Sequence, residues 1–382
     1  MSKPTEFYLP NFLQICDYSW SLHSDHGQVE NESTAWATGY GVFKNKTRAR
    51  LIQLNTGLLC GYVYPYASHD NLRIACDFVN LLFVLDDMSD EQTCAEAQKT
   101  GDVFLQSLGT NECDGSPLSL MTKESVRRSV LWITSFTNCY LCKSFKQRFT
   151  NAASINCQRR FHKHCAEYLN ATIKEAGIRE RGEVLTLDEY TLLRRQNSGS
   201  LTTFDLIECL LDIDIPDEIF DHPVFSSLVN AAADMICWSN VSVNSLYHQM
   251  GCSSFVNSEG VPFLIRSVIT QDAYSYNKEQ AMRQAGNNIL TVLMTERGIS
   301  LQDASNEVGR LFKNAMTQFA ADKTRLPTFG QAMDTAVHAY ISALETWVIG
   351  NLIWSFETLR YFGSNGLDTK KTLLIRLKTP QN

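Results

Sequence analysis

Residues 81–90 read LLFVLDDMSD, an apolar run that ends in Asp86, Asp87 and Asp90. Positions four apart share one face of a helix, so the pattern predicts that Asp86 and Asp90 lie together with Asp87 beside them. Carboxylates gathered at the end of a buried helix repel one another unless a cation compensates their charge. Mg²⁺ prefers oxygen ligands and commonly combines one or two carboxylates with water and a phosphate group. The stretch therefore predicts a magnesium site, although an isolated DDxxD is equally compatible with a solvated helix end.

Helical periodicity dominates the rest of the chain, and alternating strand patterns are scarce. Prolines such as Pro216, Pro223 and Pro327 lie between the periodic segments, as expected for helix starts and loops. No repeat or low-complexity linker divides the chain, so we expect one all-α domain over residues 1–382. The expected helices span roughly 46–60, 70–86, 92–107, 157–176, 187–194, 203–211, 224–240, 272–295, 301–321 and 329–362.

Composition narrows the class of protein. A net charge of −7 argues against a nucleic-acid partner, which would require a basic face. The 12 cysteines follow no regular framework, which indicates a reduced compartment. The N-terminus has no apolar signal-peptide core, and no apolar run is long enough for a stable membrane insertion. We therefore expect a cytoplasmic protein that acts on a small molecule.

A second group of oxygen ligands lies in residues 272–280, which read DAYSYNKEQ. Ser275 and Glu279 are four apart, so a helix places a hydroxyl and a carboxylate on one face. Lys278 lies beside them as a phosphate contact. A third oxygen ligand one turn earlier would complete a metal-binding face, but that position holds Gln271, whose extra methylene displaces its amide oxygen.

Joining WSN at 238–240 directly to residue 272 gives NDAYSYNKE. With this motif the chain resembles the fungal (basidiomycete-type) sesquiterpene synthases of the class I terpene synthase family, which pair D(D/E)xxD with NDxxSxxxE. LLRRQNSG at 192–199 and GNLIWSFETLRYFG at 350–363 extend the resemblance. The resemblance implies a single class I terpenoid synthase helical bundle with a central apolar cavity. It also implies a set of metal ligands: Asp86, Asp90, Asn240, Ser275 and Glu279.

Residues 241–271 interrupt the second motif, and we interpret them as a retained-intron insertion. The first two codons of this segment can read GTAAGT and its last codon can read CAG, which are favourable splice signals, and its removal keeps the reading frame. As the chain stands, Asn240 is no longer in helical register with Ser275. Residues 133–147 are also aperiodic and are a candidate for a second insertion.

The resemblance also assigns residues that bind the diphosphate. An arginine fork grips a pair of phosphate oxygens better than a lysine does. In the family an arginine at the position of Arg195 senses the diphosphate, and the residues three and four further on act as linker and effector. Ser198 departs from the frequent aspartate linker, whereas Gly199 is suited to expose its carbonyl at a helix break. The implied catalytic residues are Asp86, Arg195 and Gly199.

The C-terminal segment supplies a further pair, because Arg360 and Tyr361 match the family's RY dipeptide that contacts diphosphate in the closed form. Together with Arg195 and Lys278 they form the implied diphosphate-binding set. Phe83 and Trp354 are candidates for the cavity wall, where aromatic faces stabilise carbocations. Ordinary core packing is the alternative for both aromatic residues.

The function implied by the resemblance is that of a sesquiterpene synthase of fungal secondary metabolism. Such an enzyme uses three Mg²⁺ ions to ionise farnesyl diphosphate, cyclises the cation and releases diphosphate; the residues alone indicate only an allylic diphosphate. Two alternatives stay open. The insertion would leave a catalytically impaired member of the family, and a prenyl-chain elongating enzyme shares the fold but would carry a second aspartate-rich motif. A monomer and a homodimer are both compatible with the sequence.

Overall fold

The helix that carries the aspartates lies in the interior of the protein. In the computed structural model it is α5 (His69–Asp90), and residues 72–85 are buried without exception. A helix that is buried on all sides must also satisfy its polar side chains internally. Arg73 Nε donates to Asp77 Oδ1 at 2.8 Å, and Asn80 Nδ2 donates to Ser33 Oγ at 2.8 Å. The expected central position of residues 81–85 is thus accompanied by a buried polar network.

The structure describes residues 5–40, 52–90, 92–109, 114–123, 145–239 and 288–377, except the side chains of residues 86–90. The interrupting segment 241–271 lies outside the described residues, as do Asn240, Ser275, Lys278 and Glu279.

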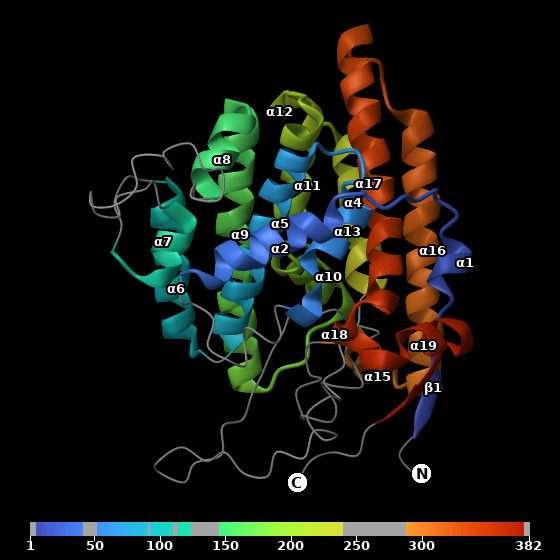
Figure 1. The fold of residues 1–382 in the computed structure, drawn as a ribbon. Helices are drawn as coiled ribbons and strands as arrows, with labels where there is room; N and C mark the ends of the chain where they lie inside the picture. Colours follow the sequence, from blue (N-terminus) through green and yellow to red (C-terminus); the bar gives the residue numbers. More distant parts are fainter. Residues whose placement is uncertain are drawn as a thin grey trace, which may run out of the picture.

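Most of the long helices run roughly side by side in the view of Figure 1, and α2 (His26–Thr38) lies across them. The elements in chain order are β1 (Glu6–Tyr8), α1 (Phe12–Ile15), α2 (His26–Thr38), α4 (Thr56–Val63), α5, α6 (Cys94–Gly109), α7 (Pro117–Lys123), α8 (Phe145–Ala152), α9 (Ile155–Arg181), α10 (Leu187–Asn197), α11 (Ser200–Leu211), α12 (Asp217–Phe220), α13 (Pro223–Ser239), α15 (Ile289–Arg297), α16 (Leu301–Arg325), α17 (Gln331–Glu357), α18 (Leu359–Phe362), the 3₁₀ turn η4 (Gly363–Asn365), α19 (Gly366–Thr372) and β2 (Leu374–Arg376).

The strands bring the two ends of the described chain together. β1 pairs antiparallel with β2, and Phe7 lies opposite Ile375. In Figure 1 this pair lies at the same end of the molecule as α18 and α19. One connected hydrophobic core includes Phe7 at one end of the chain and Ile375 at the other. The prediction of an all-helical fold is confirmed, with this short ribbon as an addition.

Several helix boundaries differ from the expected ones. The helix expected over 329–362 ends at Glu357, because Thr358 has an extended backbone (φ −69°, ψ 146°) and its hydroxyl accepts from the N–H of Arg360. α2 was not expected, since its sequence is largely polar, yet Val29 and Trp36 are buried on it. Within the candidate second insertion, Phe145 is already the first residue of α8. Tertiary packing therefore overrides weak local signals at these places.

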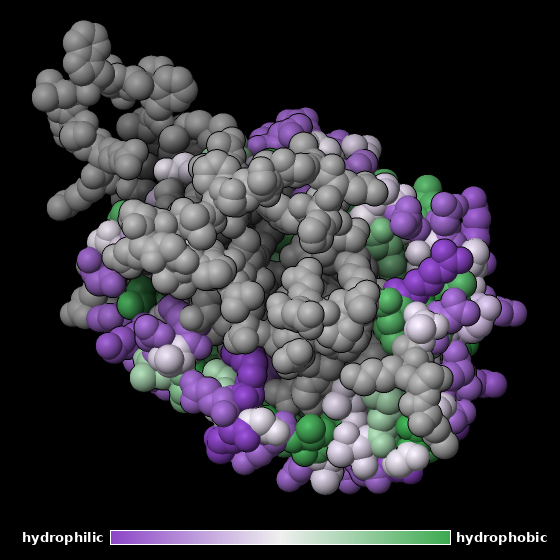
Figure 2. All heavy atoms as spheres, turned by 90° about the horizontal axis from the view of Figure 1, so that it is seen from below, coloured by the Kyte–Doolittle hydropathy of each residue, from purple (hydrophilic) through white to green (hydrophobic). Residues whose placement is uncertain are grey.

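The surface carries mixed polarity. On the face seen from below, the coloured rim alternates hydrophilic and hydrophobic side chains without one large apolar patch among the described residues (Figure 2). No helix in the described part of the chain is both long enough and apolar enough to cross a bilayer.

Candidate active site

The aspartates occupy the last turn of α5, and their backbone is helical through Asp90. The expected placement of Asp86 and Asp90 on one face therefore holds at the level of the backbone. The C-terminal end of a helix carries a partial negative charge, so carboxylates there are unfavourable unless a cation compensates them. The side chains of these residues are outside the described part. The backbone geometry and the donor chemistry together fit a divalent cation.

A break between two helices lies against α5 one turn before the aspartates. Gly199 separates α10 from α11 and has a left-handed backbone with φ +71°, which suits glycine. A Cβ at this position would lie 3.3 Å from Leu82 Cδ1. The break predicted at the LRRQNSG motif is therefore present and faces the aspartate-bearing helix.

The carbonyl of Gly199 corrects one expectation. It was expected to be exposed at the break, but it accepts hydrogen bonds from Thr202 Oγ1 at 2.7 Å and Thr203 N at 3.1 Å. Because α11 begins immediately after the glycine, donors in its first turn bond to this oxygen. The carbonyl therefore accepts the first hydrogen bonds of α11.

Arg360 contacts α5 through the ring of Phe83. Thr358 caps the short helix α18, which places Arg360 with its guanidinium carbon 5.0 Å from the centroid of the Phe83 ring. A cation over an aromatic face is stabilised by the ring quadrupole. The Arg360 Nε is buried, and no acceptor within the described residues bonds to it. Phe83, one turn before Asp86, therefore contacts a guanidinium whose buried Nε has no acceptor among the described residues.

Tyr361 and Trp354 pack against each other behind this arginine. Their ring centroids are 5.2 Å apart at an interplanar angle of 84°, and both side chains are buried. Trp354 Nε1 donates to the Leu54 carbonyl at 3.1 Å. These contacts are those of a packed core, so the roles of Tyr361 in diphosphate contact and of Trp354 in the cavity wall stay predictions.

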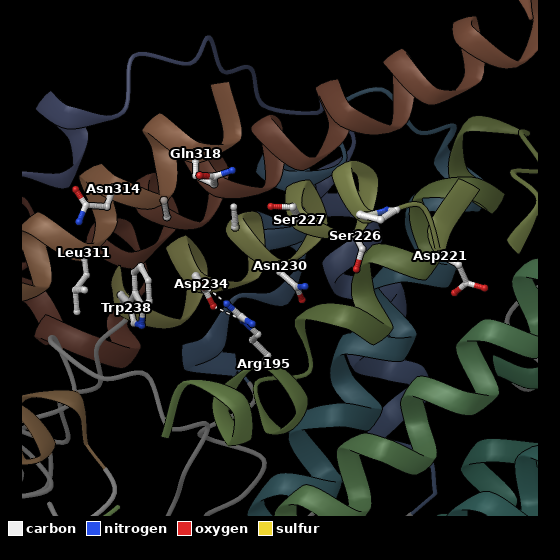
Figure 3. A pocket seen from close by; sticks show the side chains of 13 residues that line it. Arg195, Asp221, Ser226, Ser227, Asn230, Asp234, Trp238, Leu311, Asn314 and Gln318 are labelled. Carbon is white, nitrogen blue, oxygen red and sulfur yellow. Dashed lines mark hydrogen bonds and ion pairs between the residues drawn. The ribbon is translucent and has the colours of Figure 1, made fainter. Parts of the chain in front are cut away.

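The predicted diphosphate sensor already has a carboxylate partner. Arg195 Nε and Nη2 donate to Oδ1 and Oδ2 of Asp234, both at 2.7 Å. Figure 3 shows this pair joining α10 to α13. The hydrogen bonds that Arg195 donates to Asp234 raise the pKa of Arg195. Burial raises the pKa of Asp234, and the bonds from Arg195 oppose that rise. The two groups are therefore a charge-assisted, bidentate ion pair.

A pocket of about 570 Å³ opens beside this pair. Polar side chains of α13 and α16 line much of it, so it differs from the apolar cavity that the sequence led us to expect. The lining includes Arg195, Ser226, Asn230, Asp234, Asn314 and Gln318 (Figure 3).

The neighbouring residues of the LRRQNSG motif have structural contacts. Ser198 Oγ accepts from the N–H of Ser200 at 3.2 Å and contacts no carboxylate among the described residues. Arg194 Nη1 donates to Asn197 Oδ1 at 2.8 Å, and Asn197 in turn donates to Glu175 at 2.7 Å. Of the two adjacent arginines, Arg194 is buried and Arg195 is partly exposed.

The residues predicted to form the second metal-binding face lie beyond the described part of α13. α13 is described as far as Ser239, the residue that precedes Asn240. The structure does not describe Asn240, Ser275, Lys278 or Glu279. Among the residues that it does describe, no three His, Cys, Asp or Glu side chains are grouped so that they could bind a metal ion. The structure thus brings Gly199 against Leu82 and Arg360 against Phe83 on α5. Arg195 pairs separately with Asp234 on α13.

Asp234 was not identified from the sequence, although a signal was present. It is the only charged residue in PVFSSLVNAAADMICWS, the sequence of α13. A single acid in an apolar helix predicts a buried ionic partner, because an unpaired carboxylate there would be costly. The sequence does not reveal that the partner is Arg195.

Comparison with known proteins identifies similar chains. A family model described as terpene synthase family 2, C-terminal metal binding, matches residues 77–245 and 262–318. The bifunctional terpene synthase Agr4 of Cyclocybe aegerita is 36% identical and aligns over 98% of this chain and 94% of its own length. The viridiflorene synthase Agr2 of the same fungus is 31% identical over 99% and 87%. A Coprinopsis cinerea protein named linoleate 10R-lipoxygenase COP4 is 35% identical over 98% and 95%.

The fold has counterparts among solved structures. An α-eudesmol synthase superposes with a TM-score of 0.67 over 90% of this chain and 98% of its own, at 18% identity. A hedycaryol synthase bound to nerolidol gives a TM-score of 0.64 over 93% and 100%, also at 18% identity. At such low identity the likeness concerns the arrangement of the helices.

Proposed function

This chain belongs to the terpene synthase family, and from that premise we propose that it is a sesquiterpene synthase that ionises farnesyl diphosphate and cyclises the resulting cation to a hydrocarbon. The observation that carries the proposal is the convergence of Gly199 and Arg360 on α5, one turn before Asp86. Groups from three distant parts of the sequence surround one end of a buried helix. Such an arrangement suits the capture of a diphosphate.

The proposed metal ligands are Asp86 and Asp90 on one side and Asn240, Ser275 and Glu279 on the other. Three bound Mg²⁺ ions would supply Lewis-acid charge neutralisation of the diphosphate oxygens. The helical backbone of α5 supports the first side, because it carries both aspartates on one face at the negative end of the helix.

Side chains of the protein complete the site in this proposal. Arg195, Lys278 and Arg360 donate hydrogen bonds to the diphosphate, and Tyr361 joins them on closure. The ring of Phe83 orients Arg360 and, together with Trp354, forms part of an apolar cavity wall. Water is excluded from this cavity, because it would otherwise capture the cation.

We further propose that the chain forms one domain, interrupted by an insertion at 241–271. The family match supports this, because its two matched segments leave out residues 246–261, which lie inside the proposed insertion. Removal of the insertion would return Asn240 to register with Ser275 and Glu279.

The experiment compares the full chain with a variant that lacks residues 241–271. Both are incubated with Mg²⁺ and farnesyl diphosphate, and the hydrocarbon products are separated by gas chromatography and identified by mass spectrometry. We expect a cyclic sesquiterpene from the deletion variant at a higher rate than from the full chain. An Asp86→Asn change in the active form should abolish the product, since it removes a ligand charge.

Two outcomes separate the alternatives. Hydrocarbon from neither form, although both are folded and bind pyrophosphate, would favour a catalytically impaired protein. Longer prenyl diphosphates formed on addition of isopentenyl diphosphate would favour an elongating enzyme. Size-exclusion chromatography of the same samples distinguishes a monomer from a homodimer, and we propose a cytoplasmic location for either.

A further inference from the structure

We propose that Asp234 is a positioning residue that holds one edge of the Arg195 guanidinium so that its other edge faces the diphosphate. This inference rests on the proposed function, since it concerns the same diphosphate site. Asp234 does not touch the substrate and acts only through Arg195.

The geometry leaves part of Arg195 available. Asp234 occupies Nε and Nη2 through two bonds of 2.7 Å, and within the described residues no acceptor bonds to Nη1. The guanidinium is planar, so fixing one edge also fixes the direction of the remaining N–H groups. A diphosphate oxygen can bind at Nη1 without displacing Asp234.

Burial explains why the ion pair persists when a ligand binds. The side chain of Asp234 is only 10% exposed, whereas that of Arg195 is 28% exposed. Neighbours of Asp234 on α13, such as Ala233 and Met235, are buried and apolar. Release of Arg195 would leave a buried carboxylate without its cation, which is strongly unfavourable. Binding at Nη1 with the pair intact avoids that cost.

Asp234 belongs to the same helix that holds the end of α10 in place. It lies on α13 six residues before Asn240, and Cys237 Sγ on the same helix contacts the Arg194 carbonyl at 3.6 Å. The two contacts hold the end of α10 against α13. Ser198 has no carboxylate, and the acidic partner of Arg195 is Asp234 on α13.

The binding test measures inorganic pyrophosphate by calorimetry on the full chain, with and without Mg²⁺. Arg195→Ala should weaken binding by about tenfold or more, because a charge-assisted hydrogen bond is lost. Asp234→Asn should weaken it several-fold, and the double variant should bind no more weakly than Arg195→Ala alone. That non-additivity is what action through Arg195 requires.

A second measurement needs no ligand. In ¹⁵N NMR, the Arg195 Nε–H of the parent should exchange slowly with water, and Asp234→Asn should accelerate the exchange. Glu183→Gln is the matched control, since Arg181 and Glu183 form an exposed bidentate pair with bonds of 2.8 and 2.9 Å. It should leave pyrophosphate binding and the Arg195 signal unchanged.

Three results overturn the inference. Asp234→Asn could bind pyrophosphate as tightly as the parent or more tightly, its effect could add fully to that of Arg195→Ala, or Nε–H exchange could be unaffected. Failure of both the parent and the variant that lacks residues 241–271 to bind pyrophosphate would instead count against the proposed function, while the exchange measurement would still decide whether Asp234 holds Arg195.

Discussion

The guanidinium carbon of Arg360 lies 5.0 Å from the centre of the Phe83 ring, and this contact joins the short helix α18 to the aspartate-bearing helix α5. The residues are far apart in sequence, and only tertiary structure brings them together. The contact leaves the buried Nε of Arg360 without an acceptor among the described residues. The aromatic ring thus orients an arginine whose Nε can still donate a hydrogen bond to an anion.

We predict that Arg360→Ala lowers kcat/KM for farnesyl diphosphate by about 10- to 100-fold, the range expected for the loss of hydrogen bonds to a charged group. The free energy of unfolding should change little, because no carboxylate among the described residues pairs with Arg360. The assay uses whichever form of the chain makes product. Phe83→Leu should have a smaller effect, since it removes about 0.5–1 kcal/mol of cation–π stabilisation. A normal kcat/KM in Arg360→Ala would remove this residue from the site.

Gly199→Ala should both destabilise the protein and reduce turnover. The left-handed backbone costs a non-glycine residue about 1–2 kcal/mol, and the new Cβ would also contact Leu82. Urea unfolding measures the first effect and product formation the second. Gly182→Ala is the matched control, because Gly182 has φ +64° and a Cβ added there would meet nothing within 4 Å. Equal activity in the two variants would show that contact with α5 is unimportant.

Asp77 is predicted to be essential for stability. It is buried between Arg73 and Arg148 and also accepts from Ser33 Oγ at 2.6 Å, which links α2, α5 and α8. Asp77→Asn should lower the free energy of unfolding by roughly 3–5 kcal/mol, since it removes the buried negative charge that both arginines contact. The exposed carboxylate of Glu183 provides the comparison, and Glu183→Gln should cost less than about 1 kcal/mol. Similar unfolding midpoints for the two variants would contradict this prediction.

The pair formed by His164 and Asp205 predicts a dependence of stability on pH. Burial lowers the pKa of His164, but the Asp205 carboxylate, 2.7 Å from Nδ1, raises it by more than burial lowers it. The net shift of the His164 pKa is therefore upward. A raised histidine pKa stabilises the fold below the ordinary value of about 6.5, and this contribution is lost as the pH rises through the pKa of the folded state.

His164→Gln should therefore destabilise the protein more at pH 6 than at pH 9, by about 1–2 kcal/mol in denaturant titrations. The destabilisation caused by His164→Gln should differ less between the two pH values when Asp205→Asn is introduced first. A destabilisation that is the same at both pH values would contradict the assignment of the charge to this pair.

Much of the helical fold could be predicted from the sequence, because helix periodicity is a local property. The helices expected over 301–321 and 70–86 are present as Leu301–Arg325 and His69–Asp90. The resemblance to the fungal sesquiterpene synthases is confirmed by the family match and by relatives over nearly the full length. The spacing of Asp86 and Asp90 on one helix face likewise follows from local geometry alone.

The sequence by itself thus determined the helical class, the family and the position of the aspartates on α5. Tertiary structure decided which partners those elements meet: Asp234 with Arg195, Phe83 with Arg360, and Leu82 with Gly199. Periodicity reports which face of a helix is buried but not which neighbour covers it. The direction of a guanidinium depends on that neighbour, since burial makes an unpaired charge costly and so selects the carboxylate or ring that packing brings within reach.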